Sequence, residues 1–99
     1  MATRVITLKK RAILDLDEIW FSIARDDIAA ADKLLDTLKA RADQLILFPK
    51  LGPLRDDLFP DTRILVEGKY LIFYRLQKST IDILRIVHGA RDLSDLDLF

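Results

Sequence analysis

Apolar residues follow first a strand-like and then a helical spacing near the start of the chain. Residues Arg4–Leu8 are rich in β-branched side chains and predict a short strand. From Ala12 onward the apolar positions recur at three- and four-residue steps, which predicts an amphipathic helix of about three to four turns. The predicted core stripe of this helix is Ile13, Leu16, Trp20 and Ile23, with Ile19 beside them. Its predicted solvent side is Asp15, Asp17, Glu18 and Ser22.

A second helix is predicted after the polar break Arg25–Asp27. The Asp27 carboxylate can accept from the free backbone N–H groups of the next turn, which makes this residue a good N-cap. Pro49 and Gly52 end the helical pattern. Because the link is so short, the two helices are expected to pack antiparallel as a hairpin. The apolar positions of the second helix are Ile28, Ala31, Leu35, Leu38, Ala42 and Leu45.

The last part of the chain has the pattern of three strands. Residues 51–61 combine a glycine, two prolines and three aspartates with little periodicity, which predicts an ordered loop. The predicted strands are Arg63–Val66, Tyr70–Leu76 and Ile81–Val87, joined as an antiparallel meander. One face of the central strand is wholly suited to a core and the other is mixed. The chain is therefore predicted to be a single α+β domain, residues 1–99, whose helical hairpin covers one face of the sheet and leaves the other available.

Several side chains lie outside the predicted core. Leu14 and Phe21 are seven residues apart and therefore on one line of the first helix, as a second packing edge or a partner contact. The arginines of the sheet half either solvate the open face or serve an interface, where the planar guanidinium binds carboxylates well. These arginines are Arg63, Arg75, Arg85 and Arg91.

The end of the chain carries leucines between acidic residues. Gly89 allows a sharp turn off the last strand, which is expected to project Arg91 and the Leu93–Phe99 tail away from the sheet. The apolar residues of the tail favour docking over fraying, either on this chain or on a partner. Arg91 is interpreted either as a probe for a partner or as an ion-pair partner of Asp92 or Asp95.

Composition removes several classes of function. The chain has no cysteine and one histidine, His88, so disulfides, thiolate zinc sites, cysteine nucleophiles and histidine-rich metal sites are excluded, and no metal or cofactor is expected. The 16 basic residues equal the 16 acidic ones, which counts against a dedicated nucleic-acid binder. No secretory signal and no apolar run of roughly 20 residues is seen, so a cytoplasmic protein without membrane contact is predicted.

The order of these motifs resembles the ParE-type toxins of bacterial toxin–antitoxin systems. The residues that carry the resemblance are Asp15–Trp20, Ile23-Ala24, Ala29–Ala31, Pro49, Gly52, Arg55, Arg63, Tyr70–Arg75 and Arg85–Asp92, which ends in His-Gly-Ala-Arg-Asp. The resemblance covers nearly the whole chain. It implies a helical hairpin on a curved antiparallel sheet, a fold shared with RelE-type ribonucleases. It also implies two partners, a cognate ParD-like antitoxin and DNA gyrase, in a toxin–antitoxin hetero-oligomer.

Two sets of contact residues are predicted. Antitoxin contacts are expected at Leu14, Phe21, Arg75 and Arg85, which are apolar or cationic where the core does not require them. The resemblance implies target contacts around Arg91, and Arg63 and His88 are predicted to join it. The alternatives are a ribosome-dependent mRNA endonuclease of the RelE type and a domain that only binds its antitoxin. Nuclease chemistry is disfavoured because the charge is balanced and residues 89–99 lack the tyrosine that RelE-type enzymes often carry. A lone histidine at a strand end usually hydrogen-bonds locally, so no catalytic residue is predicted.

Overall fold

A computed structural model describes residues 3–99 and contains one four-stranded sheet in the order β1-β4-β3-β2. The strands are β1 (Val5–Leu8), β2 (Arg63–Glu67), β3 (Tyr70–Leu76) and β4 (Thr80–His88). The predicted α+β class and the antiparallel meander β2-β3-β4 are confirmed. The antiparallel sheet that the resemblance implied is thus found in β2, β3 and β4, and the N-terminal strand β1 is added to it parallel to β4. A parallel pair needs a long connection, which the helical hairpin, the loop and the first two meander strands supply.

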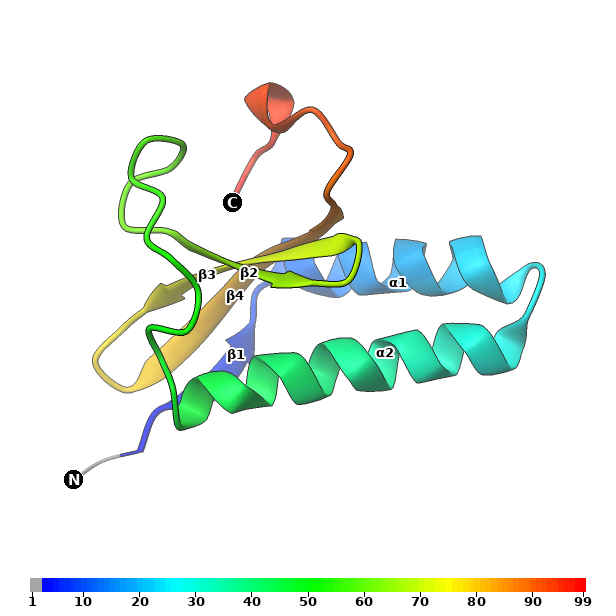
Figure 1. Ribbon diagram of the computed structural model, residues 1–99, viewed down its shortest axis with the longest axis horizontal. Helices are drawn as coiled ribbons and strands as arrows, with labels where there is room; N and C mark the ends of the chain where they lie inside the picture. Colours follow the sequence, from blue (N-terminus) through cyan, green and yellow to red (C-terminus); the bar gives the residue numbers. More distant parts are fainter. Residues whose placement is uncertain (1–2) are drawn as a thin grey trace.

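The helical hairpin lies on one face of the sheet, with α1 (Lys10–Ala24) and α2 (Ile28–Asp43) side by side (Figure 1). The predicted N-cap is confirmed, since the backbone N–H of Ala30 donates to Asp27 Oδ1 at 3.0 Å. A short 3-10 turn, Gln44–Ile46, continues α2 toward the loop. Among residues 3–99, neither helix is both long and apolar enough to cross a bilayer.

The larger apolar cluster lies between the helices and the sheet. It includes Leu38 and Leu45 from the α2 segment and Ile72, Tyr74 and Ile83 from the strands. The buried face of α1 differs from the predicted stripe, because Ala12 and Asp15 are buried whereas Ile13 is exposed. The expected solvent position of Asp15 is therefore wrong. The cause is an ion pair with Arg85 of β4, which brings the carboxylate into the interior.

Trp20 is half-buried rather than part of the packed core. Its indole Nε1 donates to Asp32 Oδ1 of α2 at 2.8 Å, and its ring meets Phe21 edge to face. A buried indole needs a partner for its N–H, and here the partner lies on the neighbouring helix. Trp20 thus joins the two helices of the hairpin near their link.

A second apolar cluster covers the opposite face of the sheet, which the sequence had suggested would be open. Phe73 and Leu84 from the sheet pack against Phe59 of the loop and against Leu96 and Leu98 of the chain end. Figure 1 shows this terminal segment, in red, on the side of the sheet away from the helices. The expectation that the tail projects away from the sheet is wrong, because burial of its leucines folds it back.

Candidate functional site

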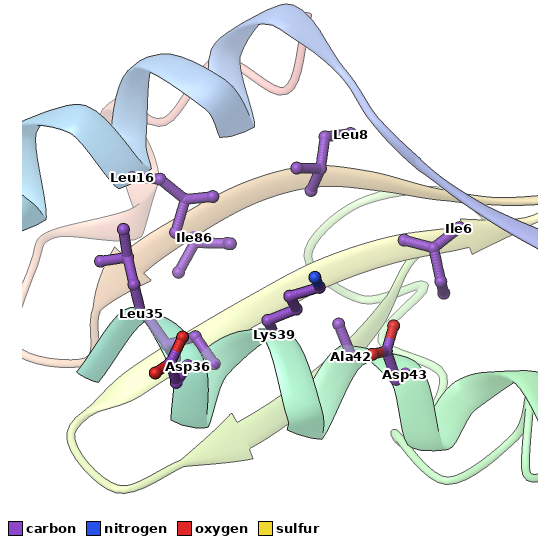
Figure 2. Close-up of a pocket in the computed structure, with 10 residues that line it drawn as sticks. Ile6, Leu8, Leu16, Leu35, Asp36, Lys39, Ala42, Asp43 and Ile86 are labelled. Atoms are coloured by element: carbon purple, nitrogen blue, oxygen red, sulfur yellow. The ribbon is translucent and has the colours of Figure 1, made fainter. Parts of the chain in front are cut away.

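An apolar groove of about 530 Å³ runs between the edge strand β1 and helix α2. Figure 2 shows Ile6 and Leu8 of β1 on one side of it and Leu35 and Ala42 of α2 on the other, with Leu16 of α1 beside Ile86 at one end. The groove exists because β1 contributes only four residues and α2 is much longer, so the helix extends past the strand. We call this feature the β1 groove.

Two side chains make the β1 groove apolar without belonging to the packed core. Leu8 and Leu35 line the groove, but neither is part of the cluster that fills the space between helices and sheet. Leu8 is 40% exposed. Leu35 is half-buried. An exposed leucine on one wall of an apolar hollow, opposite a half-buried leucine on the other wall, indicates a surface completed by a partner.

The backbone of β1 offers unpaired groups beside the groove. The N–H groups of Val5 and Lys9 donate to Ser79 and Ile83, so this side of β1 faces β4. Alternate residues of a strand point their backbone groups to opposite sides, which directs those of Ile6 and Leu8 outward. Within residues 3–99, no further strand pairs with this edge. The edge is therefore a template for an added strand.

The rim of the β1 groove is charged. Figure 2 shows Lys39 of α2 extending toward the middle of the groove, with Asp36 and Asp43 to either side along the helix. None of the three forms an ion pair with another described residue. No cluster of three metal-binding side chains occurs in residues 3–99. The chemistry of the site is thus that of an apolar surface with a polar rim, which suits a polypeptide segment.

A buried ion pair between Asp15 and Arg85 lies beneath the C-terminal tail and is hydrogen-bonded to it. Arg85 Nε and Nη2 donate to the two Asp15 oxygens at 2.7 and 2.9 Å, and the backbone N–H of Ile86 donates to Asp15 Oδ2 at 2.9 Å. Arg85 Nη1 donates to the carbonyl of Asp97 at 2.6 Å. The adjacent Asp15 carboxylate raises the pKa of Arg85 above its ordinary value. One buried guanidinium therefore ties α1 and β4 to the tail.

The four residues predicted to contact an antitoxin do not share one surface. Phe21 is 65% exposed and Leu14 is also exposed, as expected for α1 side chains off the core. The expected exposure of Arg85 is wrong, because its ion pair with Asp15 leaves it 5% exposed. Arg75 is half-covered, since it donates to Thr62 and to the carbonyl of Pro60 and lies 4.9 Å from the ring centre of Phe99. A role of these residues in antitoxin binding stays a prediction.

The three residues predicted to contact a target lie at two ends of the sheet. Arg63 is level with Tyr74 at the start of β2 and donates to the carbonyl of Gly52 at 2.9 Å. His88 is level with Tyr70, which lies four residues before Tyr74 on β3, so the two positions are about 13 Å apart along the strand direction at the usual rise of a strand.

His88 and Arg91 share one turn. The backbone N–H of Arg91 donates to the carbonyl of His88, and His88 Nδ1 accepts from the N–H of Ala90 at 3.1 Å. This is the local hydrogen bonding expected for a lone histidine. Neither Asp92 nor Asp95 forms an ion pair with Arg91 in the described part of the chain. Arg91 is exposed and available for contact.

The sequence did not single out the β1 groove. Leu8 and Leu35 were each assigned to an apolar pattern, and both patterns are real. What the spacing could not show is that the two walls stand apart instead of meeting. The short length of the first strand beside a long helix was the one available signal.

Comparisons with known proteins identify the family and the fold. The family model described as "ParE toxin of type II toxin-antitoxin system, parDE" matches residues 6–93. Toxin ParE1 of Mycobacterium tuberculosis (strain CDC 1551 / Oshkosh) is 30% identical over 95 residues, covering 94% of this chain and 96% of that protein. Toxin ParE3 of Caulobacter vibrioides is 30% identical over 81 residues, covering 81% of each. A solved structure titled "Chromosomal ParDE TA system from P. aeruginosa" has the same fold, with a TM-score of 0.72 at 21% identity over 87% of this chain and 95% of that one. The chain therefore belongs to the ParE toxin family of type II toxin–antitoxin systems.

Proposed function

We propose that this chain is the toxin of a type II system, that a ParD-like antitoxin neutralises it, and that it inhibits DNA gyrase without cutting RNA. The observation that carries the proposal is the family match over residues 6–93, which includes both helices and all but the first residue of the sheet. The solved ParDE system from P. aeruginosa, whose toxin-like chain has this fold, supports an antitoxin as partner.

The placement of the cationic residues supports binding rather than catalysis. RNA cleavage needs cations and a proton-transferring group gathered around one phosphate. Arg63 is instead bound to a loop carbonyl about 13 Å along the sheet from His88, at the usual strand rise. The balanced net charge also lacks the excess that binding to an RNA backbone requires.

We place the antitoxin in the β1 groove. Its outward backbone groups can pair with an extended segment, while Leu8 and Leu35 bury apolar side chains of that segment. This extends the site expected from the sequence, because exposed Leu14 and Phe21 lie on the neighbouring helix α1. A long antitoxin segment can contact both.

The target is tested with purified toxin in two assays run side by side. The toxin should inhibit DNA supercoiling by gyrase or accumulate cleaved DNA, and it should leave mRNA intact on translating ribosomes. Codon-spaced cuts in mRNA without any effect on gyrase would overturn the proposal in favour of a RelE-type nuclease. Growth arrest on induction, relieved by co-expression of the antitoxin, distinguishes an active toxin from a domain that only binds its antitoxin.

The antitoxin site is tested with Leu8→Ala and Leu35→Ala. Truncating an interface anchor typically costs about 2 kcal/mol, so each variant should bind the antitoxin at least roughly ten times more weakly. Folding should be retained because neither side chain belongs to the packed core. Ile28→Ala is the matched control, since Ile28 is an exposed apolar residue of α2 outside the groove. If the unmodified chain and all three variants bind the antitoxin with equal affinity, the β1 groove is not the antitoxin site.

A further inference from the structure

Large apolar side chains are exposed in the loop that follows α2. Leu47 is 78% exposed and Phe48 61%, and Leu51 is exposed beside them. Leu51 also lines a neighbouring hollow of about 360 Å³ together with Pro53 and Val66. Because this hollow and the one formed by residues 47–51 share Leu51, they form one continuous area. We call it the β2-edge surface, made of Phe48, Leu51, Pro53 and Val66 with Arg41 and Lys50.

The β2-edge surface is held in place by hydrogen bonds from the core. The buried Tyr74 hydroxyl donates to the carbonyl of Pro49 at 2.8 Å and accepts from the N–H of Gly52 at 2.9 Å. Arg63 Nη1 donates to the carbonyl of Gly52. A Cβ on Gly52 would lie 2.8 Å from the Tyr74 ring, so this approach requires glycine. The exposed apolar side chains are thus carried by an anchored loop, which lowers the entropy cost of binding.

The charges around the β2-edge surface have one sign. Arg41, Lys50 and Arg55 line its two hollows, and no described carboxylate does. Arg55 is paired with Asp57 at 2.9 Å. Among residues 3–99, Arg41 donates only to neutral groups, the side chain of Gln44 and the carbonyl of Val66, and Lys50 forms no ion pair. Two cations without anionic partners therefore flank exposed apolar side chains.

The position of this surface separates it from the β1 groove. Strands β1 and β2 are the two edges of the sheet, with β4 and β3 between them. Leu93, two residues after Arg91, lines the hollow beside Val66, so the surface adjoins the turn in which target contacts are expected. Its chemistry, apolar with unpaired cations, complements a segment in which carboxylates flank apolar side chains.

We propose that the β2-edge surface binds the target protein of the toxin, through a target segment that combines apolar and acidic side chains. This inference rests on the proposed toxin function. It assigns the target to one edge of the sheet and the antitoxin to the other.

The test compares charge and apolar variants for growth arrest, for inhibition of purified gyrase and for antitoxin affinity. Lys50→Glu and Phe48→Ala should each lower toxic potency at least tenfold, whereas Lys50→Arg should keep it. Antitoxin affinity should change less than twofold in all three. Lys33→Glu is the matched control for charge, because Lys33 is exposed on α2 away from both hollows. Circular dichroism establishes that each variant is folded.

The outcomes separate this inference from the function on which it rests. If the unmodified chain arrests growth and the Lys50→Glu and Phe48→Ala variants arrest it equally well, the β2-edge surface is not the target site, and the toxin function stands. If these variants instead lose the antitoxin while keeping their toxicity, the surface belongs to the antitoxin. If the unmodified chain neither arrests growth nor affects gyrase, the proposed function fails and the inference fails with it.

Discussion

Replacing Asp15 by alanine removes one half of a buried ion pair. The carboxylate accepts three hydrogen bonds, two from the Arg85 guanidinium and one from the backbone N–H of Ile86. Both charged residues are nearly inaccessible, with 6% of Asp15 and 5% of Arg85 exposed. The Asp15→Ala variant therefore leaves a buried guanidinium with only the Asp97 carbonyl as partner, and a backbone N–H with none.

The expected loss of stability is large. Breaking a buried ion pair by removing one partner costs about 3–5 kcal/mol, because the remaining charge stays desolvated. Domains of this size have roughly 5–15 kcal/mol of total stability, so the variant approaches the limit of folding. With a melting shift of at least about 4 °C per kcal/mol, the midpoint should fall by at least roughly 12 °C. Replacing both partners by apolar residues, Asp15→Leu with Arg85→Met, should recover most of the loss.

Urea unfolding followed by circular dichroism measures the effect. The matched control is Asp17→Ala, which removes the same charge from an exposed position of the same helix and should change the unfolding free energy by no more than about 0.5 kcal/mol. A loss below about 1 kcal/mol for Asp15→Ala would refute the reasoning, since surface ion pairs have that magnitude. It would mean that water reaches Arg85 when its partner is removed.

Three further changes test other contacts. Tyr74→Phe should cost about 1–3 kcal/mol by urea unfolding, since it leaves the Pro49 carbonyl and the Gly52 N–H without their shared partner. Burial raises the pKa of Tyr74, so the folded chain retains this proton longer than the unfolded chain does. The contribution of Tyr74 to stability should thus be complete below its ordinary pKa and decline as the pH rises above it, a decline that Tyr74→Phe should lack. Phe21→Ala should leave the unfolding free energy within about 0.5 kcal/mol, because the ring is exposed, while weakening the antitoxin complex in a titration. Asp27→Ala should cost about 1 kcal/mol through loss of the N-cap, and Asp26→Ala, beside it, much less.

Local rules predicted the elements well. The N-cap at Asp27 was predicted correctly because a cap depends on the residue itself and the three that follow it. The same holds for the helical hairpin and for the three strands of the meander, each of which has its own spacing and turn residues. These features require no knowledge of distant contacts.

Distant contacts account for what the sequence did not show. Asp15 looks solvent-facing by helical spacing, and only the guanidinium of Arg85, 70 positions away in the chain, explains its burial. Ile83 and Ile86 are three residues apart on β4, so strict alternation would place their side chains on opposite faces of the sheet. Both lie in the same apolar cluster because the β3–β4 register shifts between Phe73 and Tyr74. The tail likewise folds back because of Ile64, Phe73 and Leu84, none of which is near it in sequence.

The two edges of the sheet differ in how they are protected. The start of β2 is covered by the loop, because Ile64 donates to the carbonyl of Pro53 and Leu54 bridges to Arg63. Strand β1 has no such cover among residues 3–99. An exposed edge beside an apolar groove is prone to pairing with other chains, and a cognate antitoxin strand would supply the missing backbone hydrogen-bond partners.

Three strand spacings of about 4.8 Å separate β1 from β2, so a segment confined to the β1 groove ends roughly 14 Å short of the β2-edge surface. An antitoxin that blocks the proposed target site directly must therefore extend beyond the groove, around the helices or across the tail.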